Sequence, residues 1–174
     1  MARFVRWFVA VAVMALVCAG AMLAFAPKSK SNSEAEIKAQ IDGWLAAFKA
    51  KDAAKIISFY APGDPVLAFD VIPPRQYATL DAYKKDFEDL FKLLDGPLNV
   101  EMTNLSITTS NGDLAYGHSI DHLIAKTSDG KPLDITVRVT DVYRKIGGKW
   151  LVVHEHVSVP VDLMTGQADL QSKP

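Results

Sequence analysis

The sequence predicts an α+β domain in which three N-terminal helices pack on one curved antiparallel sheet. Helical hydrophobic periodicity is confined to the first half of the chain, and four strand-like segments separated by short turn motifs fill most of the second half. With 174 residues, of which 49% are hydrophobic, the chain is long enough to bury one core. Its formal net charge of -1 supplies no basic field, so we expect no nucleic-acid partner.

Residues 1–26 are predicted to be a targeting segment. Arg3 and Arg6 flank the start of an uncharged run, residues 7–26, which matches the basic and apolar regions of a secretory signal peptide. We expect cleavage after Ala21 and export of the remainder to the periplasm or the medium. The alternative is an uncleaved helix that anchors the protein in the inner membrane, because a run of this length can just span a bilayer. We expect membrane contact only through this run.

The first helix is expected to follow a linker, residues 27–33. Ser33 and Glu36 have the spacing of a capping box at a helix start. Apolar residues then recur on one helical face, which we expect to be buried: Ile37, Ile41, Trp44, Leu45 and Phe48. Asp52 is placed to cap a second, short helix that ends before the turn at residues 61–65.

A short apolar strand, residues 66–70, is predicted between the second and third helices, and Pro73-Pro74 ends it. Thr79 is placed to cap the third helix, which Gly96-Pro97 stops. The inner face of this helix is predicted to carry Tyr83, Phe87, Leu90, Phe91 and Leu94.

Four strands are predicted after the third helix. The turn motifs Asn111-Gly112, Ser128-Asp129-Gly130 and Gly147-Gly148 divide residues 98–159 into an antiparallel meander. Pro160 ends the last strand, and residues 161–174 are expected to form an exposed tail. Strict alternation in the last strand sets Leu151, Val153, Glu155, Val157 and Val159 on one face, and Trp150, Val152, His154, His156 and Ser158 on the other.

This order of elements resembles the nuclear transport factor 2-like superfamily, which includes SnoaL-like polyketide cyclases, ketosteroid isomerases and scytalone dehydratases. The segment Phe69-Asp70 and the ending Lys149-Trp150 with His154, His156 and Ser158 carry the resemblance. The ending is most similar to the association domain of calcium/calmodulin-dependent kinase II. The resemblance covers about residues 34–160, which we take as a SnoaL-like domain. It implies a cone-shaped fold with a cavity between the sheet and the helices.

Three acidic residues interrupt otherwise apolar strand faces. Alternation places Asp141 on the inner face of its strand and Glu155 on the inner face of the last strand. Matched to the kinase association domain, Asp121, Asp141 and Val157 stand where that family has pocket arginines. The pocket is therefore expected to be acidic, which favours a cationic ligand or a protonated acid and opposes a carboxylate ligand. Alternatively, a register shift or bulge turns these acids outward, or they pair with basic side chains across the sheet.

Asp70 carries a second resemblance. Matched to ketosteroid isomerases, Asp70 stands at the general-base aspartate, and Trp44 replaces the tyrosine of the oxyanion hole. The resemblance therefore makes Asp70 a candidate general base, with Asp121 and Asp141 as further candidates. The alternative is a turn residue that accepts backbone hydrogen bonds at a strand end.

These observations predict a protein that binds a small, largely apolar molecule in its cavity. The predicted ligand-binding residues are Trp44, Phe69, Asp70, Tyr83, Phe87, Asp121, Asp141, Tyr143 and Glu155. An isomerase, cyclase or dehydratase that uses an aspartate base is the first alternative, and a dimerisation or assembly module without ligand is the second. We expect no cofactor. We also expect no metal, because the strand that carries Arg138 lies between the two histidine pairs, His118 with His122 and His154 with His156, and keeps them too far apart for one ion. The outer sheet face, with Arg138, Trp150, His154 and His156, is expected to form a homodimer.

Overall fold

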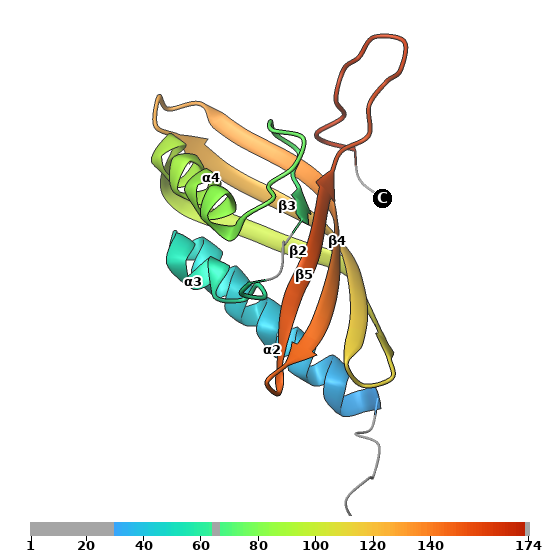
Figure 1. Ribbon diagram of the computed structural model, residues 1–174. Coiled ribbons are helices and arrows are strands. Elements are labelled where there is room, and N and C mark those ends of the chain that lie inside the picture. The colour runs from blue at the N-terminus through green and yellow to red at the C-terminus, as the bar shows by residue number, and fades with distance from the viewer. Residues whose placement is uncertain (1–29, 64–66, 173–174) are drawn as a thin grey trace, which may run out of the picture.

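The computed structural model describes residues 30–63 and 67–172, so the predicted targeting segment, residues 1–26, lies outside the described part. Three helices, α2 (Lys30–Lys49), α3 (Ala53–Ile57) and α4 (Leu80–Leu93), lie on one side of a five-stranded sheet (Figure 1). None of the described helices has the length and hydrophobicity needed to cross a membrane. The α+β class and the two-layer arrangement predicted from the sequence are confirmed.

The sheet is mixed, with the strand order β1-β5-β4-β3-β2. Its strands are β1 (Leu67–Phe69), β2 (Leu94–Ser110), β3 (Leu114–Thr127), β4 (Pro132–Ile146) and β5 (Lys149–Ser158). The four long strands form the predicted antiparallel meander, whereas β1 pairs in parallel with β5 at the edge. Parallel pairing joins segments that are far apart in the sequence, so the local alternation and turn motifs do not reveal it.

Helix α2 begins at Lys30, earlier than the predicted capping box. Ser33 is therefore inside the helix and buried, with 1% of its surface exposed, instead of capping the helix. Glu36 Oε1 accepts a hydrogen bond from the Asn32 side chain in the first turn at 3.2 Å, and its Oε2 accepts one from Trp150 Nε1 on β5 at 3.0 Å. The cap of α4 is confirmed, because Thr79 Oγ1 accepts a hydrogen bond from the backbone N–H of Ala82 at 3.2 Å.

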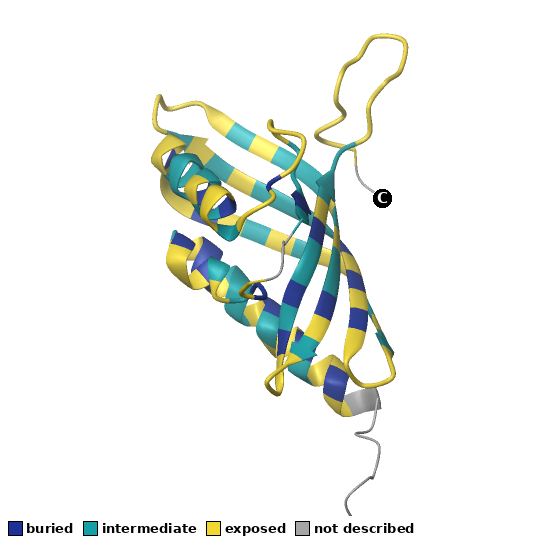
Figure 2. Ribbon diagram, in the orientation of Figure 1, coloured by how far each residue is buried: buried dark blue, intermediate teal, exposed yellow. Residues whose placement is uncertain are grey.

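The core lies between the helices and the concave side of the sheet, as the distribution of buried residues in Figure 2 shows. Buried side chains from all three helices meet buried side chains from the long strands, and they include Ile37, Phe48, Ile56, Tyr83, Phe87, Leu98, Ala115 and Tyr143. The predicted inner faces of the first and third helices thus supply most of the helical side of this core. Burial of these apolar faces is the main reason why the helices stay on the sheet.

A β-bulge changes the predicted faces of β5. Val142 of β4 pairs with His154, but Tyr143 pairs with Val152, so Val153 is an extra residue on the β5 side. Strict alternation breaks at this point. Trp150, with 4% of its surface exposed, and Val152, with 3%, therefore pack into the interior. The prediction that Trp150 shares the outer face with the β5 histidines was wrong for this reason.

Residues 161–172 form an exposed loop that folds back on itself. Val161 bridges Ala168, and the backbone N–H of Thr136 on β4 donates to the carbonyl of Leu170 at 2.7 Å. The loop projects away from the sheet at the top of Figure 1. Most of it is exposed, as expected for the tail, but it contacts the edge of β4 beyond the end of β5.

Candidate ligand-binding cavity

A cavity of about 290 Å³ lies between the helices and the concave face of the sheet. Helices α2 and α4 line one side, strands β2 to β5 line the other, and the segment after β1 lies at its border. Most of its surface is apolar, with aromatic side chains on the helical side (Trp44, Phe48, Tyr83 and Phe87) and aliphatic ones on β4 (Leu133, Ile135, Val137 and Val139). Such a lining with a few polar groups is typical of small-molecule sites.

Strand alternation brings three acids to this apolar face. Asp121 on β3 is paired with Val137 on β4, and Asp141 on β4 is paired with Glu155 on β5. Directly paired residues of antiparallel strands point to the same side of the sheet, so all three carboxyl groups line the cavity. The bulge at Val153 lies before Glu155 and leaves this pairing intact. The prediction of an acidic inner face is therefore confirmed, and the alternative in which a bulge turns the acids outward is not observed.

Glu155 is the most enclosed of these acids, with 5% of its surface exposed. Tyr60 Oη donates to its Oε2 at 2.6 Å, and Tyr83 Oη donates to its Oε1. Trp44 Nε1 in turn donates to Tyr60 Oη at 3.2 Å. Burial raises the pKa of Glu155, the nearby charge of Asp141 raises it further, and the two tyrosine hydrogen bonds act in the opposite direction. The effect of burial on the pKa is larger than that of the two hydrogen bonds, so the protonated form of Glu155 is favoured near neutral pH.

Asp141 has one satisfied oxygen and one without a donor. Tyr143 Oη donates to Oδ2 at 2.7 Å, whereas the buried Oδ1 has no N–H or hydroxyl donor among the described residues. Burial is the largest cause of the raised pKa of Asp141, and the charge of Asp121 adds to it. Asp141 is therefore a half-buried acid whose Oδ1 accepts no hydrogen bond from an N–H or hydroxyl group of the described residues, and a hydrogen bond with Glu155 acts to lower its pKa.

Asp121 and Asp70 complete the set of predicted acids, and both line the cavity. Ser119 Oγ donates to Asp121 Oδ1 at 2.7 Å, and burial raises the pKa of Asp121 to about 6. Burial raises the pKa of Asp70 to about 6 as well, against a hydrogen bond at 2.5 Å from the backbone N–H of Val71. The cavity and turn interpretations of Asp70 are thus both correct: its carboxyl group lines the cavity and also accepts a local backbone hydrogen bond.

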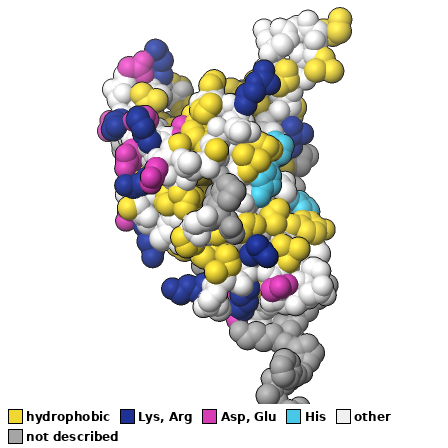
Figure 3. Space-filling model, viewed as in Figure 1, with side chains coloured by type: hydrophobic (Ala, Val, Ile, Leu, Met, Phe, Trp, Pro, Cys, Tyr) yellow, Lys and Arg dark blue, Asp and Glu magenta, His cyan; other side chains and the backbone are white. Residues whose placement is uncertain are grey.

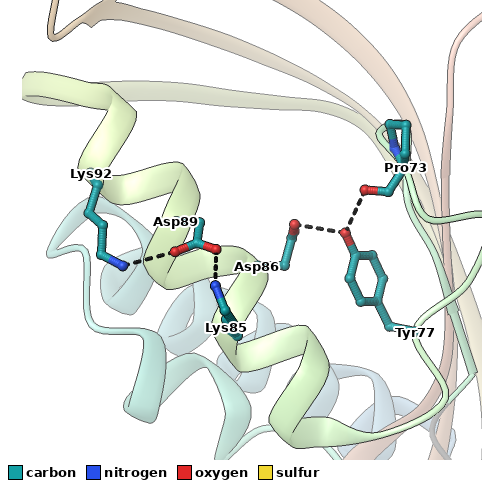
Figure 4. Close-up of polar contacts among 6 residues, drawn as sticks. All are labelled: Pro73, Tyr77, Lys85, Asp86, Asp89 and Lys92. Atoms are coloured by element: carbon teal, nitrogen blue, oxygen red, sulfur yellow. Dashed lines mark hydrogen bonds and ion pairs between the residues drawn. The ribbon is translucent and has the colours of Figure 1, made fainter.

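Sequence reasoning missed Tyr60 and Asp86. Asp86 also lines the cavity, and Tyr77 Oη donates to its Oδ1 at 2.7 Å and to the carbonyl of Pro73 at 3.2 Å (Figure 4). Asp89, one turn away on α4, instead bonds with lysines on the outside of the helix (Figure 4). Asp86 follows Tyr83 by three positions and precedes Phe87, so its helical phase could have indicated an inward position. No local signal identifies Tyr60 as the partner of a residue on β5.

Phe69 does not line the cavity, contrary to the sequence prediction. Its ring lies 5.3 Å from the ring of His154 and 5.6 Å from that of His156, on the other face of the sheet. The reason is alternation in β1: Ala68 pairs with Glu155 and is fully buried, so its neighbour Phe69 must point outward and Asp70 inward again.

The outer face of the sheet carries the other predicted groups. Arg138 and His156 are exposed, and His154 is half-buried with its Nδ1 2.6 Å from the carbonyl of Leu67. Figure 3 shows histidine side chains near one another and beside hydrophobic ones on this surface. In the described part of the chain, no cluster of three or more histidine, cysteine or acidic residues has a geometry suited to a metal ion. A homodimer through this face remains a prediction.

Known proteins share both the sequence pattern and the fold. The family model of the SnoaL-like domain matches residues 37–162. A nuclear transport factor 2-like protein of unknown function from Pseudomonas putida is 33% identical, with a TM-score of 0.74, and the match covers 84% of this chain and 100% of that one. No protein in a search of curated proteins matches significantly.

Two more distant structures share the fold. A ketosteroid isomerase-like protein from Erwinia carotovora is 20% identical with a TM-score of 0.60, and the match covers 71% of this chain and 93% of that one. A protein from Xanthomonas campestris, provisionally described as a calcium/calmodulin-dependent protein kinase II association domain, is 24% identical with a TM-score of 0.62, covering 71% and 84%. At these identities the likeness shows the cone fold alone.

Proposed function

The chain belongs to the SnoaL-like domain family, and on this basis we propose that it binds a small, largely apolar molecule in the cavity between its helices and its sheet. The observation that carries the proposal is the cavity of about 290 Å³, whose lining is mostly aromatic and aliphatic with a few acids. A volume of this size suits a compact ring system, and the polar groups are placed to orient it.

The binding proposal can be tested with N-phenyl-1-naphthylamine, a neutral dye that becomes fluorescent in apolar surroundings. Val139→Phe places a bulky side chain into the cavity from β4, whereas Thr140→Phe places the same side chain on the exposed face of that strand. We expect saturable binding to the wild type and to Thr140→Phe, and at least tenfold weaker binding to Val139→Phe. Equal binding to all three proteins, or no saturable binding to the wild type, would contradict the proposal.

A second candidate function is proton transfer by Asp70, as in an isomerase, cyclase or dehydratase. The supporting observation is that its carboxyl group lines the cavity and that burial raises its pKa to about 6, close to the range of a useful general base. In Asp70→Asn, a pure binding protein should keep its affinity for the dye. An enzyme should lose turnover of its substrate while keeping its fold and its affinity.

We propose further that residues 1–26 direct the protein out of the cytoplasm and that the chain is cleaved after Ala21. The support is the sequence pattern of basic residues followed by an uncharged run. The intact mass of the protein isolated from a periplasmic extract tests this. Loss of residues 1–21 is the expected result, and a full-length mass in the membrane fraction would instead indicate an anchor.

A further inference from the structure

The groups that can carry a full charge at the cavity wall are all carboxyl groups. Five carboxyl groups from five different parts of the fold border it: Asp70, Asp86, Asp121, Asp141 and Glu155. Among the described residues that line the cavity there is no lysine, arginine or histidine. Glu155 is buried and the other four acids are half-buried, and carboxylates withdrawn from water are costly without a compensating cation or proton. In the free protein, protons on Asp141 and Glu155 fill part of that role, but no described residue of the lining supplies a permanent positive charge.

One oxygen of Asp141 is buried without an N–H or hydroxyl donor among the described residues. This oxygen is Oδ1, while Oδ2 is held by Tyr143 at 2.7 Å. Both oxygens of Glu155, the residue opposite, already accept hydrogen bonds from tyrosines. A buried acceptor left without a donor destabilises the free protein, and a ligand with an N–H group could recover that free energy.

Aromatic rings provide the rest of the environment. Trp44 and Phe48 stack with their centroids 5.2 Å apart, and Phe87 packs edge-on against both of them. All three rings line the cavity. Aromatic rings attract cations over their faces and also accommodate the apolar body of a ligand.

We propose that the ligand is a small lipophilic amine in its protonated form, with its ammonium group donating a hydrogen bond to Asp141 Oδ1 and its hydrocarbon body against the aromatic rings. The inference rests on the proposed binding function and specifies its ligand class. Because acids in the cavity hold protons near neutral pH, binding of the cation should release about one proton per ligand.

Benzylammonium and ethylbenzene are suitable probes, because they have the same number of heavy atoms and nearly the same shape but differ in charge. Benzylammonium stays protonated from about pH 5 to about pH 8, as expected for an alkyl amine. The experiment measures how well each probe displaces N-phenyl-1-naphthylamine from the full-length protein, once at about pH 5 and once at about pH 8. It is repeated with Asp141→Asn and with Asp134→Asn, which changes an exposed acid on the opposite face of β4.

At about pH 8 we expect benzylammonium to bind at least tenfold more tightly than ethylbenzene. This preference should shrink towards pH 5, because the carboxyl groups that face the ligand become protonated. These groups are Asp121 on β3, Asp141 on β4, Glu155 on β5, Asp86 on α4 and Asp70 after β1. Tyr60, Tyr83 and Tyr143 also face these acids but remain neutral, since burial raises the pKa of each. Asp141→Asn should lose most of the preference and Asp134→Asn should keep it.

Two results would overturn the inference in distinguishable ways. If ethylbenzene displaces the dye as well as benzylammonium at about pH 8, the cavity binds small molecules but does not select amines. If the dye itself does not bind, the proposed binding function fails, and the ligand class fails with it. Should Asp141→Asn fail to fold, the comparison of the two probes in the wild type at the two pH values decides alone.

Discussion

Asp141 on β4 and Glu155 on β5 are direct partners across two antiparallel strands, and both carboxyl groups line the same largely apolar cavity. Each has a tyrosine donor of its own: Tyr143 bonds to Asp141, and Tyr60 bonds to Glu155. Two buried acids this close favour a state in which at least one carries a proton. The protonation state of this pair therefore affects both the stability of the fold and the charge inside the cavity.

The first prediction concerns pH. Burial raises the pKa of Asp141 to about 7 and that of Glu155 to about 8, from ordinary values near 4 in the unfolded chain. At pH values between the unfolded-state pKa near 4 and the raised folded-state pKa of each acid, the folded protein holds more protons than the unfolded chain. The free energy of unfolding must therefore fall as pH rises through this range. The expected slope is about 1.4 kcal/mol per pH unit for each excess proton.

Urea denaturation across about pH 4.5 to 8 measures this slope. Glu155→Gln keeps the size and polarity of the side chain but cannot ionise, so it should flatten the profile and gain stability relative to the wild type above about pH 7. Glu88→Gln, on the outside of α4, serves as the control and should leave the slope unchanged. A wild-type profile that rises with pH in this range would contradict the protonated pair.

The second prediction concerns the donors to Glu155. Tyr60→Phe removes the hydroxyl that donates to Glu155 Oε2 and accepts from Trp44 Nε1. Loss of one partner in a buried network is expected to cost about 1–3 kcal/mol and to raise the pKa of Glu155 further. Tyr116→Phe, at a side chain with 49% of its surface exposed, should change stability by less than about 0.5 kcal/mol. If both substitutions changed the stability equally, the hydrogen bond from Tyr60 to Glu155 would not contribute to the stability of the fold.

The third prediction concerns Gly117 on β3. A Cβ atom at this position would lie 3.4 Å from the ring of Tyr143 and 3.5 Å from the carbonyl of Ser106, which is ordinary contact, so a side chain that branches beyond Cβ would crowd the ring. Gly117→Val is expected to cost about 1–3 kcal/mol and to disturb the hydrogen bond from Tyr143 to Asp141. The exposed neighbour His118 provides the control His118→Val. Differential scanning calorimetry of both variants checks the difference, and an unchanged melting temperature for Gly117→Val would contradict this packing.

Local patterns in the sequence were sufficient for most of the fold. Helical periodicity placed Trp44, Tyr83 and Phe87 on inner faces, and strict alternation placed Asp141 on the inner face of β4. These predictions succeeded because the period of hydrophobic residues directly reflects which face of an element is buried. The inward direction of Asp121 came from the family resemblance and is confirmed by the cavity lining.

The errors arose where structure depends on non-local pairing. Trp150 was predicted on the wrong face of β5 because one extra residue in that strand shifts the alternation. Nothing in the local sequence marks this bulge. The direction of Phe69 is set by the parallel pairing of β1 with β5, which only the tertiary fold creates. The contact between Tyr60 and Glu155 joins residues far apart in the chain and was equally beyond local patterns.

The most direct test of ligand binding in the cavity is an NMR titration that follows the indole N–H signals of Trp44 and Trp150 as N-phenyl-1-naphthylamine is added. Trp44 lines the cavity, whereas Trp150 is buried outside its lining and donates to Glu36 at 3.0 Å, so the two indoles are matched reporters inside and outside the site. A saturable shift of the Trp44 signal with a stationary Trp150 signal is the predicted result. A stationary Trp44 signal at saturating dye would show that the cavity is not the binding site.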